Sequence, residues 1–320
     1  MGNSKIINFK VLKSNCFAIA LSILFINCST PDSPKDKTVI IIPEQPTTPE
    51  TPQVNINPLA PYANINFDNW KVTLPVDENN NGSPDEYSAA QLSNFGYRTL
   101  TPIMPFMYDD TSDESIVFYT YPATSTSNSN YSRTELREMI NPNDSKVNWT
   151  LDQGGTIEGT LKMVSVTPDN STTSYDFHRV IVMQIHGVIK QTDVAIHNFS
   201  SNNGPPLLKI YWIDGHIIAY KKSLVNSAAE GDALLSTSSA VWTDIKHDFG
   251  YVGYDKFKLK IIASTGKLKV SLNDTNIHVF QDISLSKWPF ENYFKAGNYL
   301  ITTDTEAKAT VKYYNLNVTH

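Results

Sequence analysis

Short runs of alternating apolar and polar residues recur along most of this chain, separated by clusters of Asn, Gly, Asp, Ser and Pro. Side chains alternate between the two faces of a β-strand, so this pattern predicts many short strands joined by turns. The predicted strands are residues 69–74, 115–120, 155–164, 179–185, 207–212, 256–262, 267–272 and 309–318. Only residues 88–94 are typical of a short helix, with a helical turn at 285–288. The pattern therefore favours an all-β sandwich or barrel of antiparallel strands.

The first 28 residues have a different pattern. Three lysines precede an apolar run at residues 17–26, which is typical of a secretory signal peptide and short for a membrane span. Cys28 follows directly and resembles the lipidated first residue of a bacterial lipoprotein, although Asn27 stands where that pattern usually has a small residue. We expect lipidation at Cys28. The alternative is ordinary secretion with a buried or trimmed cysteine.

The sequence thus divides into three parts. Residues 1–28 are the predicted lipoprotein-type signal peptide, residues 29–57 are a Pro/Thr-rich linker, and residues 58–320 are one large domain. Both cysteines lie in the leader, so the domain has no disulfide or thiol chemistry. We expect an exported protein, displayed as an outer-membrane lipoprotein at the bacterial cell surface or otherwise secreted or periplasmic.

The formal net charge of −6 argues against nucleic acid as a partner. A polyanionic ligand would need a local basic groove rather than a basic protein. We expect a monomer whose membrane contact is through a lipid anchor only.

Residues 133–140 carry the first candidate cluster. Strand periodicity places Arg133, Glu135 and Arg137 on one face. A salt-bridge ladder on a solvent face is one interpretation. However, two arginines around one glutamate leave a surplus positive charge, which suits a carboxylate ligand held by a guanidinium, with Glu135 orienting the arginines.

Two further strands carry candidates. Period two places His178, Val180 and Val182 on one face with Gln184 and His186. A lone histidine is more often structural, but His186, next but one to a glutamine and beside a glycine, is a candidate general base.

In residues 292–299, Tyr293, Lys295, Gly297 and Tyr299 share a face. Such tyrosines are often only packing residues. The glycine between Lys295 and Tyr299 predicts a notch for a bound chain.

These residues form the motifs Arg-Thr-Glu-Leu-Arg, Gln-Ile-His and Tyr-Phe-Lys-Ala-Gly-Asn-Tyr. All three stand in the order found in alginate lyases of polysaccharide lyase family 7. Residues 69–75 and 311–320 resemble that family's opening and closing strands, so the resemblance spans residues 66–320. It implies a β-jelly roll, a sandwich of two antiparallel sheets with a concave substrate groove.

The resemblance also implies β-elimination on alginate, leaving a C4=C5 unsaturated uronate. Arg133 and Gln184 match the residues that neutralise the C6 carboxylate, and His186 matches the base that takes the C5 proton. Tyr299 matches the acid that protonates the departing O4, and Lys295 matches a substrate-contacting lysine. The expected substrate-binding set is Arg137, Glu135, Lys295 and Tyr293. No cofactor is expected, because protein donors neutralise the charge.

Two weaker signals concern specificity and metal. Within the family, the isoleucine at position 185 is associated with guluronate-containing substrates. Asp77, Asn79 and Asn81 partly match a calcium loop, but Ser88 stands where the loop's glutamate belongs. We expect a plain turn there and no metal.

Three other functions remain open from the sequence: a non-catalytic jelly-roll carbohydrate-binding module, a lyase for another uronate polymer, and a jelly-roll glycoside hydrolase. A binding module has no need of a base and a phenol. A hydrolase needs a carboxylate pair, whereas Glu135 and Glu138 are three residues apart and so face opposite sides of a strand.

Overall fold

The computed structural model describes residues 57–126 and 128–320. The predicted signal peptide, Cys28 and the Pro/Thr-rich segment up to residue 56 lie outside the described residues, so those assignments stay predictions. None of the helices in the described part of the chain is long and apolar enough to cross a membrane.

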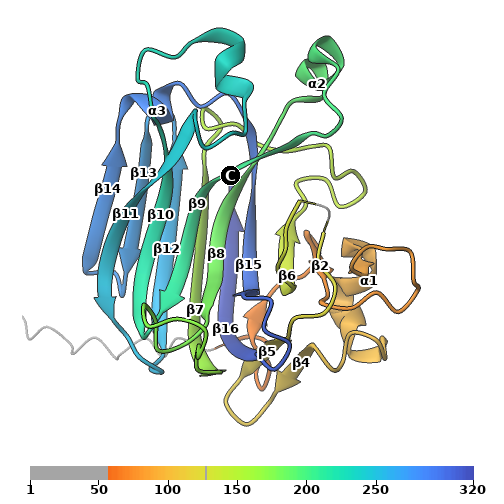
Figure 1. The fold of residues 1–320 in the computed structure, drawn as a ribbon. Coiled ribbons are helices and arrows are strands. Elements are labelled where there is room, and N and C mark those ends of the chain that lie inside the picture. Colours follow the sequence, from red (N-terminus) through yellow and green to blue (C-terminus); the bar gives the residue numbers. More distant parts are fainter. Residues whose placement is uncertain (1–56, 127) are drawn as a thin grey trace, which may run out of the picture. The chain divides into compact units, whose positions relative to one another are not determined.

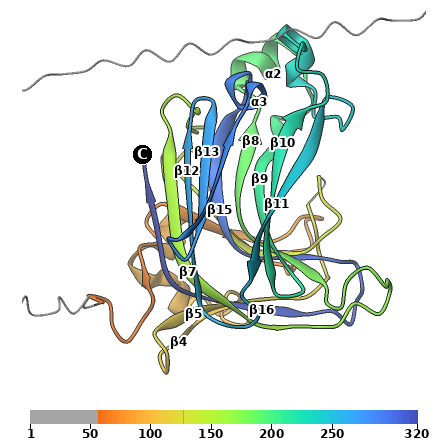
Figure 2. The ribbon, with the colours of Figure 1, turned by 90° about the vertical axis from the view of Figure 1, so that its left-hand side faces the viewer.

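Two sheets of eight strands each form the domain, and Figures 1 and 2 show them packed as two layers. The site sheet has, in spatial order, β11 (Trp242–Tyr251), β10 (His216–Leu224), β9 (Asn203–Ile213), β8 (Arg179–Val188), β15 (Glu291–Ile301), β6 (Arg133–Glu138), β2 (Trp70–Thr73) and β3 (Glu86–Tyr87). The back sheet has β14 (Asn276–Gln281), β13 (Lys267–Leu272), β12 (Phe257–Ser264), β7 (Gly155–Val166), β16 (Ala309–Thr319), β5 (Ser115–Thr120) and β4 (Met107–Asp110).

All neighbours in these two sheets are antiparallel, and β1 (Asn64–Ile65) adds a short parallel pairing to β16. The helices are short: α1 (Ala89–Leu92), α2 (Gln191–His197), α3 (Ile283–Ser286) and the 3₁₀ segments η1 (Ser93–Thr99) and η2 (Gly231–Leu235). The predicted all-β jelly-roll sandwich is confirmed. The predicted helix at 88–94 corresponds to α1 and the start of η1.

The core lies between the sheets and takes the apolar face of each strand. Ile185, Phe294 and Ala296 of the site sheet are fully buried, as are Leu161 and Ile261 of the back sheet. Alternation therefore leaves the other face of the site sheet free for polar side chains.

Asn298, on β15 next to Tyr299, links the two sheets. Its Nδ2 donates to the carbonyl oxygens of Phe118 on β5, at 3.0 Å, and Ala309 on β16, at 2.8 Å. The side chain is fully buried, so these bonds satisfy carbonyl groups that water cannot reach. With Asn298 fixed inward, the neighbouring Tyr299 is turned to the opposite face, toward solvent.

The period-two assignment for β8 is wrong in its first half. The register with β9 shifts between Ile181 and Met183, which pair with the consecutive residues Tyr211 and Ile210, so Val182 is an extra residue on β8. Val182 and Met183 are consequently both buried in the core, and Ile181 instead reaches the face that carries Gln184 and His186. A β-bulge of this kind adds one residue to a strand and reverses the alternation.

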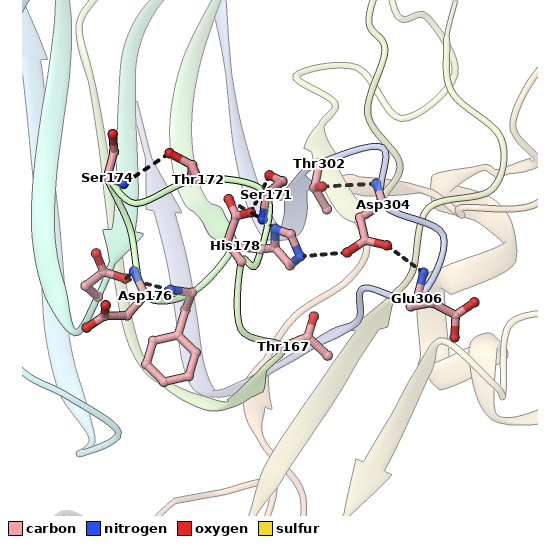
Figure 3. Close-up of polar contacts among 12 residues, drawn as sticks. Thr167, Ser171, Thr172, Ser174, Asp176, His178, Thr302, Asp304 and Glu306 are labelled. Atoms are coloured by element: carbon pink, nitrogen blue, oxygen red, sulfur yellow. Dashed lines mark hydrogen bonds and ion pairs between the residues drawn. The ribbon is translucent and has the colours of Figure 1, made fainter.

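His178 does not share that face either. Its ring is 1% exposed, with Nδ1 3.5 Å from Asp169 and Nε2 3.3 Å from Asp304. Figure 3 shows the contact with Asp304, which joins the loop before β8 to the loop between β15 and β16. His178 is thus a structural tie between two loops.

Candidate active site

The three motif strands are neighbours in the order β8–β15–β6. Tyr299 pairs with Arg133 and Lys295 with Arg137 across β15 and β6. On the other side of β15, Lys295 pairs with Gln184 and Tyr293 with His186. The fold therefore brings together all eight of the predicted site residues on one part of the site sheet.

Glu135 lies at the centre of this cluster, beneath its surface. The carboxylate is 1% exposed, accepts a hydrogen bond from Gln184 Nε2 and forms an ion pair with Lys295 Nζ. Its second oxygen also lies 3.6 Å from Arg133 Nη1. Predicted among the substrate-binding residues, Glu135 does not line the groove; it holds three side chains that do.

Arg133 keeps part of its guanidinium free. The side chain is mostly buried, yet its Nε and Nη2 have no hydrogen-bond partner among the described residues. Such buried donors are costly unless a ligand satisfies them. The planar group also lies over the ring of Tyr299, 3.9 Å from its centroid.

Arg137 is anchored to the protein. Its Nη2 donates to Ser145 O at 2.8 Å and to Asn148 Oδ1 at 2.9 Å. Its guanidinium lies 4.1 Å from the ring centroid of Tyr293, which in turn stacks on His186 at 5.3 Å with an interplanar angle of 10°. Arg137 and Tyr293 thus fix the orientation of the imidazole as well as contributing to the groove wall.

The half-buried His186 presents one ring nitrogen to the groove. Its Nδ1 lies 3.0 Å from the carbonyl oxygen of Gly187, which can only accept, so Nδ1 carries the hydrogen and Nε2 has the free lone pair. Burial and the cations Lys295, Arg133 and Arg137 lower the pKa of His186 to about 3. The imidazole is therefore neutral near pH 7 and can accept a proton.

Tyr299 is half-buried beside Arg133. Burial raises the pKa of its phenol, while Arg133 and a hydrogen bond with Ser129 act in the opposite direction. The phenol is consequently protonated near pH 7 and can donate a proton.

Gly297 has a backbone reason to be glycine. Its φ is +141°, and a Cβ would stand 2.6 Å from the carbonyl oxygen of Thr134 on β6. The residue is buried and its N–H donates to Tyr313 Oη at 3.1 Å. The predicted notch is therefore a close approach of β15 to β6, not an opening for a ligand.

Apart from Glu135, the predicted site residues line a groove with a cavity of 530 Å³. Its basic side chains are Lys71, Arg133, Arg137, Lys209, Lys222 and Lys295. Glu86 is the only carboxylate in the described lining, and it is paired with Lys71 at 2.6 Å. The groove thus carries a positive surplus on a protein whose formal net charge is −6.

The positive surface continues across the site sheet in register. Following the strand pairing gives the row Lys71, Arg137, Lys295, Gln184, Lys209, Tyr220 and Lys246. Lys246 Nζ lies 4.7 Å from the ring centroid of Tyr220. Neighbouring strands are about 4.8 Å apart, so the four steps from Lys295 to Lys246 span about 19 Å.

Sequence reasoning missed the β9–β11 part of this row and Ser129. The sequence did contain a signal for this part of the row. Lys209 and Tyr211 are two residues apart, as are Tyr220 and Lys222, so strand periodicity places the members of each pair on one face. Ser129 lies in a loop, where no periodicity reports its direction.

The possible calcium loop is a turn in this structure. Asp77 accepts the N–H groups of Asn81, at 2.9 Å, and Gly82, at 2.8 Å, and Asn79 donates to Asp85 at 2.5 Å. Within residues 57–126 and 128–320, no group of three or more His, Cys, Asp or Glu side chains is arranged to hold a metal ion.

The hydrolase alternative lacks its carboxylate pair. Glu138, on the opposite face of β6 from Glu135, is 4% exposed and accepts hydrogen bonds from Trp149 Nε1, at 3.0 Å, and Phe294 N, at 2.9 Å. It also contacts His320 Nε2 at 2.7 Å. Glu138 therefore serves the packed interior and cannot reach the groove.

Comparison with known proteins gives one consistent result. A family model described as alginate lyase matches residues 65–320. An alginate lyase of Klebsiella pneumoniae is 25% identical over 305 residues, covering 82% of this chain and 91% of that protein.

Solved structures agree. The crystal structure of alginate lyase A1-II', a member of polysaccharide lyase family 7, is 28% identical with a TM-score of 0.59, covering 79% of this chain and 95% of that chain. A variant of A1-II', with a histidine replaced by asparagine and a tyrosine by phenylalanine, was solved in complex with substrate (GGMG). It is 27% identical with a TM-score of 0.59, covering 79% of this chain and 93% of that chain.

The electrostatic environment of His186 is testable by titration. We expect its imidazole to titrate far below the ordinary midpoint of about 6.5, near 3. Lys295→Met removes a nearby positive charge, so it should raise the midpoint. The measurement is histidine NMR against pH, with the His186 signal assigned by its loss in His186→Ala.

Lys267→Met, on the back sheet, is the matched control and should leave the midpoint unchanged. An ordinary midpoint in the unmodified protein would contradict the electrostatic assignment.

Proposed function

Because the chain belongs to the alginate lyase family, and is a polysaccharide lyase of family 7, we propose that it cleaves the 4-O-glycosidic bond by β-elimination. The product is a C4=C5 unsaturated uronate at the new non-reducing end. The reaction must remove a weakly acidic C5 proton, which places negative charge on the C6 carboxylate. Stabilising that charge is the main task of the site.

Arg133 and Gln184 are proposed to neutralise the carboxylate. Two buried nitrogens of Arg133 have no partner among the described residues, so a carboxylate would satisfy them. The Gln184 amide is oriented by Glu135 and lines the same groove. A fixed donor aimed at developing charge typically contributes roughly 10²–10³ in rate.

His186 is proposed to take the C5 proton on Nε2. The Gly187 carbonyl oxygen selects the tautomer that leaves this nitrogen free. The cations that lower the pKa of His186 also attract the uronate, whose negative charge then offsets them and makes the imidazole more basic. Substrate binding thus prepares the base.

Tyr299 is proposed to protonate the leaving oxygen. As the C5–H electron pair forms the C4=C5 bond, the C4–O4 bond breaks and its electron pair stays on O4. The Tyr299 phenol then gives O4 its proton, and the phenolate forms beside the Arg133 guanidinium. Each positioned acid or base contributes roughly 10²–10⁴ in rate.

One observation carries this proposal: a guanidinium edge without a partner among the described residues, an imidazole and a phenol line one cavity, held in register by three adjacent strands. A binding module would not need the base and the acid. The basic row from Lys71 to Lys246 supports a polyanionic chain that lies across the strands.

We also propose a preference for guluronate-containing blocks. The support is indirect: Ile185 occupies the middle of the motif, and the related enzyme A1-II' was solved with GGG product and GGMG substrate. Ile185 is fully buried in the core, so it acts on the groove only through the position of its neighbours Gln184 and His186.

The role assignment predicts that His186→Ala and Tyr299→Phe each lower turnover by about 10²–10⁴ with the fold intact. Turnover is followed on guluronate and mannuronate blocks by the ultraviolet absorbance of the unsaturated uronate, and the fold by circular dichroism. The half-buried His216 and the exposed Tyr251 give matched controls, His216→Ala and Tyr251→Phe. Near-normal activity of either site variant would refute the role of that residue.

The basic row predicts a dependence on chain length. Tyr220→Ala and Lys246→Ala should raise KM for long oligouronates by roughly two- to fivefold, as expected for exposed ionic contacts, and leave kcat unchanged. Short oligouronates that end near Lys295 should be unaffected. Lys269→Ala on the back sheet is the control. An equal change for short and long chains would contradict this placement of the substrate.

A further inference from the structure

Ser129 contacts the phenol of Tyr299 from outside the three motif strands. It lies in the loop between β5 and β6, and its Oγ is hydrogen-bonded to Tyr299 Oη. The side chain is half-buried and lines the groove. The Ser129 hydroxyl is thus the hydrogen-bond partner of the phenol oxygen, while Arg133 contacts the face of the ring.

The remaining contacts of Ser129 define what its hydroxyl can do. The Oγ accepts the N–H of Tyr131 at 3.1 Å, so that backbone group fixes the position of the oxygen. The carbonyl oxygen of Tyr131 lies 3.4 Å away and is a second acceptor for the hydroxyl hydrogen. A serine hydroxyl has one hydrogen and rotates to suit its partners. It can therefore point to Tyr131 O or to Tyr299 Oη.

From this geometry we propose that Ser129 is a positioning residue for the acid of the elimination, switching from hydrogen-bond acceptor to donor as Tyr299 loses its proton. Before the reaction, the phenol donates to Ser129 Oγ and the serine hydrogen points to Tyr131 O. After the phenol has given its proton to O4, the Ser129 O–H rotates and donates to the phenolate. No proton leaves Ser129. The inference rests on the proposed role of Tyr299.

The effect of Ser129 on the pKa of Tyr299 can be distinguished from the effects of the other groups around the phenol. The Arg133 guanidinium lies over the ring, and the Tyr131 ring is 6.5 Å away. Lys295 lines the groove and is ion-paired with Glu135, which lies beneath its surface. Burial raises the pKa of Tyr299, and the hydrogen bond from Ser129 lowers it. Removing the hydroxyl should therefore raise the pKa of Tyr299.

Ser129→Ala is expected to have two linked effects. A hydrogen bond to a charged group contributes about 1.5–3 kcal/mol, so kcat at the pH optimum should fall roughly 10- to 100-fold. The alkaline limb of the kcat profile should move to higher pH, because the phenol holds its proton more tightly. Ser129→Thr keeps the hydroxyl and should restore most of the rate and the original limb.

The control separates this role from simple loop order. Ser132 Oγ donates to Thr124 O at 2.9 Å and accepts the N–H of Ala123 at 2.9 Å in the same loop. Ser132→Ala should lower thermal stability without moving the alkaline limb. Tyrosine Cζ NMR, with the Tyr299 signal assigned by its loss in Tyr299→Phe, reports the titration directly and separates it from that of Lys295.

Two outcomes would overturn the inference while leaving the elimination intact. One is a Ser129→Ala enzyme with unchanged kcat. The other is a slower enzyme whose alkaline limb and Tyr299 titration both match those of the unmodified protein, because a structural role alone would do that. The proposed role of Tyr299 fails separately, through full activity of Tyr299→Phe.

Discussion

A buried carboxylate organises the groove. Glu135 contacts side chains from β6, β8 and β15, and each of these contacts fixes a group that faces the substrate. One carboxylate cannot neutralise Arg133, Arg137 and Lys295, so the cluster keeps positive charge in a partly dry site. Burial lowers the pKa of Lys295 to about 8, which shows how unfavourable that charge is. An arriving uronate carboxylate relieves this condition.

The same cations have two consequences for the chemistry. In the proposed elimination they attract the polymer and stabilise the charge that develops on its carboxylate. Together with burial, they also keep His186 neutral and able to accept a proton, while burial keeps Tyr299 protonated. Opposite protonation states of the proposed base and the proposed acid near pH 7 thus arise from one arrangement of charge and burial.

Much of this arrangement follows from strand periodicity. Lys295 and Tyr299, for example, lie on one strand, and period two places them on the same face. The first and last residues of each motif follow this rule. The β8 bulge opposite β9 is an exception, because one extra residue reverses the alternation and leaves no mark in the composition. It places Ile181 in the groove. The role of Gly297 was misjudged for a related reason. Its constraint is the close approach of β6, where its partner Glu135 lies 162 residues earlier in the chain, so no local pattern reports it. Contacts from loops, such as that of Ser129, depend on tertiary structure alone.

The most direct test of the account uses an oligouronate deuterated at C5 and the masses of its products. Elimination predicts that the masses of the two products sum to the mass of the substrate, apart from the abstracted deuterium, which exchanges with solvent. The new non-reducing end should carry a double bond and no deuterium. Products that gain the mass of one water and keep deuterium at C5 would contradict it, since they require hydrolysis instead of proton abstraction.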